Sequence, residues 1–138
     1  VNKAKEAGYI MSCMVILGLG GKKYSKEHIK GTAEVISSCS PNYVGALTLY
    51  LENGIKQEFI DKYNGEFVKI NDDEGLEELY ELVNQINTEQ EIVFRVNHGS
   101  NAYTVKGTFP QDKQEMLEKV EWMKDHPEIV RPQGIRGF

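Results

Sequence analysis

The chain has 138 residues, of which 40% are hydrophobic, with a formal net charge of -5 and a sequence pI of about 5.3. This length suits one domain, and the acidic balance offers no basic surface for nucleic acid. No apolar run approaches the roughly 20 residues that cross a bilayer, and no signal-peptide pattern is present. We therefore expect neither a nucleic-acid partner nor a membrane partner.

The two cysteines, Cys13 and Cys39, match no zinc or iron–sulfur spacing, so we expect no metal site in this chain. Two cysteines are also too few for a disulfide scaffold, which favours a reducing, cytoplasmic location. Residues 1–8 start at a valine and are typical of the last turns of a helix that ends at a glycine. This start favours a piece cut from a longer protein.

An apolar run closed by glycines dominates the first part of the chain. Residues 11–17 are almost all apolar, and three of the next four positions, Gly18, Gly20 and Gly21, are glycine. Apolar residues on consecutive positions favour a strand over residues 9–17 that is buried on both faces, as in a parallel sheet. The glycines allow a tight turn or a close approach to a ligand.

A helix is predicted directly after this turn, over residues 25–38, with Ser25 as its N-cap and Pro41 beyond its end. Strand, turn and helix form the unit that binds ligands at the carboxyl ends of strands in parallel α/β folds. A buried strand with a purely structural turn is the alternative. The turn lacks both the phosphate-loop pattern and the dinucleotide-binding glycine spacing.

The later elements alternate between strand and helix patterns. In chain order we expect a parallel strand over 43–51, a short helix over 55–63, an extended piece over 66–70, a helix over 72–87, a strand over 91–96, a loop over 98–109, a helix from Pro110 to Lys124, and an extended or partly disordered tail over 126–138. This order predicts a parallel sheet with helices packed against it.

Polar side chains gather at the end of the third predicted strand. Arg95, Asn97 and His98 precede Ser100 and Asn101 in a segment that a parallel sheet would present on its ligand side. His98 is a candidate general acid or base because its unperturbed pKa lies near neutrality, and Arg95 would need an acidic partner or an anionic ligand if buried. The alternative is that these groups only hold a long loop in place through local hydrogen bonds.

Three separated segments resemble the C-terminal part of radical S-adenosylmethionine (radical SAM) enzymes, most closely the coproporphyrinogen III oxidase-like oxidoreductases. The segments are residues 15–28, with Val-Ile-Leu-Gly-Leu-Gly-Gly followed by Ser-Lys-Glu-His, residues 41–54, and residues 94–113, with Phe-Arg-Val-Asn-His-Gly-Ser-Asn followed by Lys-Gly-Thr-Phe-Pro-Gln-Asp-Lys. The likeness covers about residues 7–120. The order and spacing of the three segments support the resemblance more strongly than any single segment does.

This resemblance implies a partial TIM-type barrel, a half-barrel of parallel strands with helices on its outer face, over residues 1–125. Such enzymes hold a [4Fe–4S] cluster on a CxxxCxxC loop near the start of the barrel, and this chain contains no such triplet. The resemblance therefore implies the back end of the barrel, with the cluster bound elsewhere in a parent oxidoreductase that acts on a small-molecule substrate.

The resemblance also implies contacts to S-adenosylmethionine. The family's GxIxGxxE-like pattern is matched here by Ile16 and Gly18, whereas Met14 stands in place of a glycine and Gly21 in place of the glutamate. The implied cofactor-binding residues are Ile16, Gly18, Gly20, Gly21, Leu49, Leu51 and Asn97. The fragment alone is expected to be inactive.

Two other functions remain open from the residues alone. One is a non-enzymatic α/β domain that binds a ligand or partner, and the other is a complete small enzyme that uses His98 and Arg95. A fragment of a barrel would also expose a strand edge and part of its apolar interior, so we expect the isolated chain to self-associate there.

Overall fold

A computed structural model describes residues 1–51, 53–63 and 65–136. Its centre is a four-stranded sheet in the order β1-β2-β3-β4, in which the first three strands are parallel and β4 is antiparallel to β3. The strands are β1 (Ser12–Leu17), β2 (Tyr43–Thr48), β3 (Ile92–Val96) and β4 (Val105–Phe109). The predicted α/β class is confirmed.

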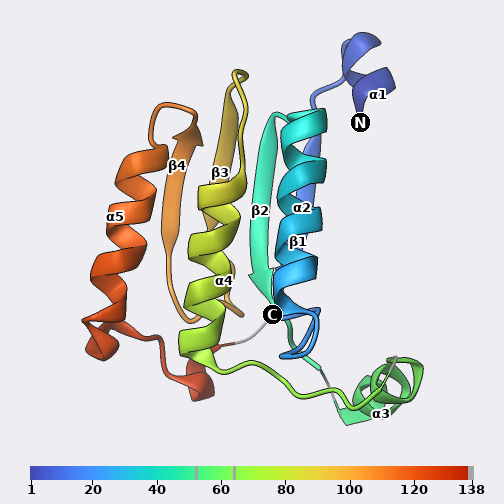
Figure 1. Cartoon of the computed structure of the whole chain (residues 1–138), viewed down its shortest axis with the longest axis vertical. Coiled ribbons are helices and arrows are strands. Elements are labelled where there is room, and N and C mark those ends of the chain that lie inside the picture. The colour runs from blue at the N-terminus through green and yellow to red at the C-terminus, as the bar shows by residue number, and fades with distance from the viewer. Residues whose placement is uncertain (52, 64, 137–138) are drawn as a thin grey trace.

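Helices cover one face of this sheet. The helices are α1 (Asn2–Glu6), α2 (Ser25–Cys39), α3 (Asn53–Lys62), α4 (Asp72–Gln85) and α5 (Lys113–Lys124), followed by two 3-10 turns, η1 (Pro127–Ile129) and η2 (Gln133–Ile135). Figure 1 shows α2, α4 and α5 side by side in front of the strands, with α3 beyond the carboxyl end of β2 and α1 at the opposite end. None of the helices in the described part of the chain is long and apolar enough to span a membrane.

The opposite face of the sheet has no helix over it in the described part of the chain. Side chains of a strand alternate between the two faces, so Val44, Ala46 and Phe94 are buried under the helices, whereas Met14 and Ile16 are 63% and 38% exposed. We call this second surface the open face. It carries the residues Ser12, Met14, Ile16, Tyr43, Gly45, Leu47, Val93, Arg95, Lys106 and Thr108.

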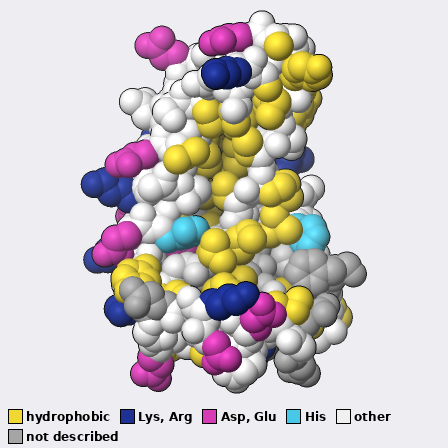
Figure 2. Space-filling view, turned by 90° about the vertical axis from the view of Figure 1, so that its right-hand side faces the viewer, with side chains coloured by type: hydrophobic (Ala, Val, Ile, Leu, Met, Phe, Trp, Pro, Cys, Tyr) yellow, Lys and Arg dark blue, Asp and Glu magenta, His cyan; other side chains and the backbone are white. Residues whose placement is uncertain are grey.

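The open face corrects the prediction that the first strand is buried on both sides. β1 is also the edge of the sheet, because β2 is the one strand that pairs with it among the described residues. Figure 2 shows hydrophobic side chains gathered along the side of the molecule that carries β1. The consecutive apolar residues of this strand therefore divide between a core under the helices and an exposed apolar surface.

The core lies between the sheet and the helices, and α4 is its central helix. Leu76, Leu79, Leu82 and Val83 of this helix are at most 2% exposed and form its apolar stripe toward the core. A capping box begins the helix: the Asn71 side chain accepts from the Glu74 N–H, and the Glu74 carboxylate accepts from the Asn71 N–H. The predicted start of this helix at residue 72 is therefore confirmed.

Two predicted segments differ in the structure. Residues 98–109 were expected to form a loop, but their last part is β4, in which burial alternates and Gly107 lets the Met116 side chain approach the backbone. Residues 66–70, predicted as a short extended piece, belong to no helix or strand of the structure, and the N-cap of α2 is Tyr24 rather than Ser25.

The tail also departs from the prediction. Up to Arg136 it forms the two 3-10 turns and folds back onto the carboxyl ends of the strands, instead of extending away. Residues 137–138 lie outside the described part. At the other end of the chain, the expected helix end is confirmed, with Gly8 at a φ of +85° after α1.

Candidate functional site

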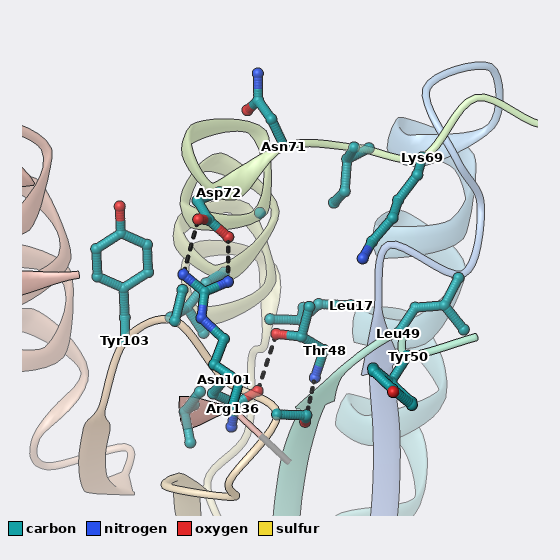
Figure 3. A pocket seen from close by; sticks show the side chains of 16 residues that line it. Leu17, Thr48, Leu49, Tyr50, Lys69, Asn71, Asp72, Asn101, Tyr103 and Arg136 are labelled. Atoms are coloured by element: carbon teal, nitrogen blue, oxygen red, sulfur yellow. Dashed lines mark hydrogen bonds and ion pairs between the residues drawn. The ribbon is translucent and has the colours of Figure 1, made fainter. Parts of the chain in front are cut away.

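A cavity of about 480 Å³ opens where the three parallel strands end (Figure 3). Leu17, Thr48 and Val96, the last residues of β1, β2 and β3, line it on the helix-covered side of the sheet. The start of α4, the segment before it and the tail supply the other walls. Parallel α/β proteins bind ligands at this end of their strands, so the cavity is the candidate functional site.

The glycine turn lies beside this cavity. The space next to its glycines is occupied by other residues of the same chain. Gly18 and Gly21 have φ values of +81° and +54°, which glycine adopts without steric cost. A Cβ at Gly20 would lie 2.6 Å from the Tyr24 carbonyl oxygen, and one at Gly21 would lie 2.9 Å from the Phe67 ring. The close approach that requires these glycines is therefore to the chain's own backbone and ring.

The same turn anchors the segment that contains α3. The Tyr63 hydroxyl donates to the Gly20 carbonyl at 2.6 Å, and the Lys22 N–H donates to the Val68 carbonyl at 2.9 Å. The rings of Phe59 and Tyr63 each meet the Phe67 ring edge-on, with centroids 5.0 Å apart. These contacts hold the segment between β2 and α4 at the edge of the cavity.

A buried carboxylate that the sequence analysis missed fixes the end of β1. Glu78 of α4 is 3% exposed and accepts from the Gly18 N–H and from the Ser25 hydroxyl, both at 2.6 Å. Ser25 was expected to cap its helix, but its hydroxyl joins α2 to α4 instead. The Gly18 N–H is therefore already bonded and does not offer a donor to a ligand.

A side-chain amide in the loop after β3 is hydrogen-bonded to the end of β2. Asn101 is 1% exposed; its NH₂ group donates to the Ala46 carbonyl at 2.9 Å, and its oxygen accepts from the Thr48 hydroxyl at 3.0 Å. The Ser100 hydroxyl accepts from the Thr48 N–H at 3.3 Å and lies 3.0 Å from His98 Nδ1. This part of the polar segment thus holds the loop in place, as the structural alternative predicts.

The tail closes one wall of the cavity through an ion pair. Arg136 donates to both carboxylate oxygens of Asp72, at 2.7 and 2.8 Å, and its Nε donates to the Arg131 carbonyl at 2.6 Å. Arg131 in turn donates to the His98 and Gly99 carbonyls. Two parallel hydrogen bonds between a guanidinium and a carboxylate are a strong, directional arrangement, so the tail has a defined position over the site.

The carboxylates at the start of α4 also change the pKa of a buried tyrosine that lines the cavity. Tyr103 is 7% exposed and lines the cavity. Burial raises the pKa of the Tyr103 hydroxyl, and the carboxylates of Asp73 and Asp72 raise this pKa further, while the Arg136 guanidinium opposes them. Tyr103 is therefore held as a neutral phenol.

The structure separates the residues that the sequence analysis grouped as a site. Leu49 is 8% exposed and lines the cavity, whereas Gly18, Gly20 and Gly21 are buried behind its wall. Ile16 lies on the open face of β1. Leu51 is half-buried beyond β2, and Asn97 is exposed beyond β3; neither lines the cavity.

The two candidate catalytic residues also lie outside the cavity. The guanidinium of Arg95 is on the open face, where it donates to the Phe94 and Gly107 carbonyls at 2.8 and 3.0 Å. His98 Nδ1 is engaged locally with Ser100. Neither side chain is among those that line the cavity. Lys69, Asp72 and Arg136, the charged residues that do line it, were not recognised because no local motif joins them.

Neither cysteine belongs to a possible metal site in the described part of the chain, which holds no group of three or more His, Cys, Asp or Glu side chains suited to a metal ion. Cys13 and Cys39 are both partly buried, and burial raises the pKa of the Cys39 thiol. Comparisons of the chain with protein-family models, curated proteins and solved structures find no match.

Proposed function

We propose that this chain is the C-terminal part of a radical SAM oxidoreductase and contributes part of the S-adenosylmethionine and substrate side of its barrel. The observation that carries the proposal is the sheet itself. In the described part of the chain, three parallel strands have helices on one face, and the other face exposes apolar side chains. A half-barrel has the same two surfaces, an outer one covered by helices and an inner one that faces the lumen.

The open face supports this assignment by its composition. Met14, Ile16 and Tyr43 are large apolar or aromatic residues, and a monomeric protein normally buries a cluster of such residues. The free edge of β1 is where the preceding strand of a barrel would pair. In the proposed parent, upstream strands cover both the edge and part of the open face.

The residues present do not fit an iron–sulfur cluster, because two cysteines cannot supply the three thiolates of a CxxxCxxC loop. We place the cluster in the upstream part of the parent and derive no step through it. Of the residues expected to contact S-adenosylmethionine, Ile16 lies on the open face, the lumen side of the proposed half-barrel, whereas Leu49 lines the cavity on the helix-covered side. The glycine turn has its own backbone and ring contacts and provides no groove.

The upstream reading frame and the iron content test the proposal together. We expect the codons before Val1 to encode a CxxxCxxC motif, and the full-length protein to take up four irons per chain after anaerobic reconstitution. The 138-residue chain, as the matched control, takes up none. An upstream sequence without the motif, or a four-iron cluster on the 138-residue chain alone, contradicts the proposal.

A non-enzymatic α/β domain that binds a ligand is the second candidate, and the cavity favours it. Its volume of about 480 Å³ falls in the range of small-molecule sites, and it is formed entirely within this chain. Absence of the upstream motif together with ligand binding by the 138-residue chain favours this second function.

A further inference from the structure

We propose that the cavity at the carboxyl ends of β1–β3 binds a small organic monocarboxylate with an apolar body, through the ammonium of Lys69. The proposal does not rest on the radical SAM assignment, because the cavity and its test involve only the 138-residue chain. It concerns a ligand class that none of the sequence motifs indicates.

The charged residues around the cavity favour a ligand that carries a single negative charge. Of the described residues, three charged side chains line the cavity, the cations Lys69 and Arg136 and the carboxylate Asp72, so this lining carries a single net positive charge. Arg136 and Asp72 neutralise each other through their two hydrogen bonds. The nearby carboxylate of Glu74 is paired with Lys22 at 2.6 Å. Among the charged side chains that line the cavity, Lys69 is therefore the one without a partner in the described part of the chain.

The geometry directs that charge into the cavity. Lys69 follows the segment that contains α3, and Figure 3 shows its ammonium reaching toward the cavity from the side opposite the Arg136–Asp72 pair. No described residue forms an ion pair or a hydrogen bond with this ammonium. An anion between the two walls would pair with Lys69 and lie beside the remaining N–H groups of Arg136.

The apolar residues that line the cavity indicate the chemical character of the uncharged part of the ligand. Leu17, Leu79 and Val96 are among the apolar lining residues of the cavity, and each of them is at most 3% exposed. The Thr48 hydroxyl already donates to the Asn101 amide oxygen, so the ligand has to contact other polar groups. An apolar body of several carbon atoms fits this apolar lining, whereas a small inorganic anion would leave it uncovered.

Titration of the isotopically labelled 138-residue chain with hexanoate, followed by amide resonances in NMR spectra, tests the proposal. For a ligand of this size we expect a Kd of about 1 mM, with saturable shifts at Thr48, Ile70 and Gly75. Hexylamine and inorganic phosphate, which reverse the charge or remove the apolar body, are expected to bind at least about fivefold more weakly.

Two lysine variants separate the site from the overall charge. Lys69→Met is expected to weaken hexanoate binding about fivefold, because it removes the ammonium and keeps the length of the side chain. Lys3→Met, which removes an exposed lysine from α1 at the far end of the sheet, is expected to leave binding unchanged. Melting curves of both variants should match the wild type, since both side chains are at the surface.

Several results would overturn the proposal. They are the absence of saturable hexanoate shifts, equal binding of hexylamine or inorganic phosphate, unchanged affinity in Lys69→Met, and shifts confined to Ile16 and Val93 on the open face. None of these results bears on whether the parent carries a cluster, so this proposal and the radical SAM assignment can fail independently.

Discussion

Removal of the buried Glu78 carboxylate should strongly destabilise the fold. Glu78→Ala leaves the Gly18 N–H buried without an acceptor, at a cost of about 1–3 kcal/mol, and also removes the bond to the Ser25 hydroxyl and opens a small cavity. We expect a total loss of about 3 kcal/mol in the free energy of unfolding, which corresponds to about 10 °C in melting temperature for a domain of this size.

A conservative variant separates hydrogen bonding from charge. In Glu78→Gln the amide oxygen can still accept from Gly18 and the NH₂ group can donate to Ser25, so we expect a loss of only about 1 kcal/mol. Glu81→Ala, on an exposed position of the same helix, is the control and should change stability by less than about 0.5 kcal/mol. Thermal and urea unfolding measure all three. Equal melting of Glu78→Ala and the control, or equal damage by Ala and Gln, would refute the reasoning.

Three further predictions concern the glycine turn, the start of α4 and the open face. Gly20→Ala should cost at least about 2 kcal/mol because its Cβ meets the Tyr24 carbonyl, whereas Gly31→Ala, with open space in α2, should be neutral or stabilising; equal urea midpoints would contradict this. The hydrogen bond from Lys22 lowers the pKa of Glu74, so its contribution to stability is complete above the usual glutamate pKa and is lost as the pH falls through the lowered value. In Glu74→Gln the melting temperature should therefore fall less steeply than in the wild type as the pH drops below the usual glutamate pKa, and an unchanged fall would rule this out. Light scattering should show self-association of the 138-residue chain that Ile16→Lys on the open face prevents, and a monomeric wild type would contradict it.

Local patterns predicted the elements that are strongly periodic. Leu76, Leu79 and Val83 recur at helical spacing in α4, and β3 is rich in branched residues, so both elements were predicted. The strand β4 was missed because its five residues include Gly107 and follow a segment rich in polar and small residues, a composition typical of loops. Its pairing with β3 is a tertiary interaction that no local pattern contains.

The two faces of the sheet could not be distinguished from an apolar run. Met14 and Val15 are adjacent and both apolar, yet the first is exposed and the second packs against the core. Burial of both faces requires a second layer, and a local sequence pattern does not reveal whether one is present. The exposed residues are nevertheless the ones that the half-barrel interpretation leaves uncovered.

The cavity lies at the end of the sheet where we expected a ligand to bind, but its lining differs from the residues that we expected there. The carboxyl ends of the parallel strands do form a cavity, as the glycine-closed first strand indicated. Its charged lining combines Lys69 and Asp72 with Arg136, which comes from the tail. Such a long-range ion pair depends on how the tail folds back, and the segment before Arg136 resembled an extended tail because of its prolines and glycines.

Reductive cleavage of S-adenosylmethionine by the full-length protein tests the central proposal most directly. The protein that contains this chain would be reconstituted anaerobically, supplied with S-adenosylmethionine and a low-potential reductant, and assayed for 5′-deoxyadenosine by chromatography. A radical SAM parent predicts 5′-deoxyadenosine that depends on both the reductant and the cluster. A full-length protein that carries its complete iron content and forms no 5′-deoxyadenosine would contradict the assignment.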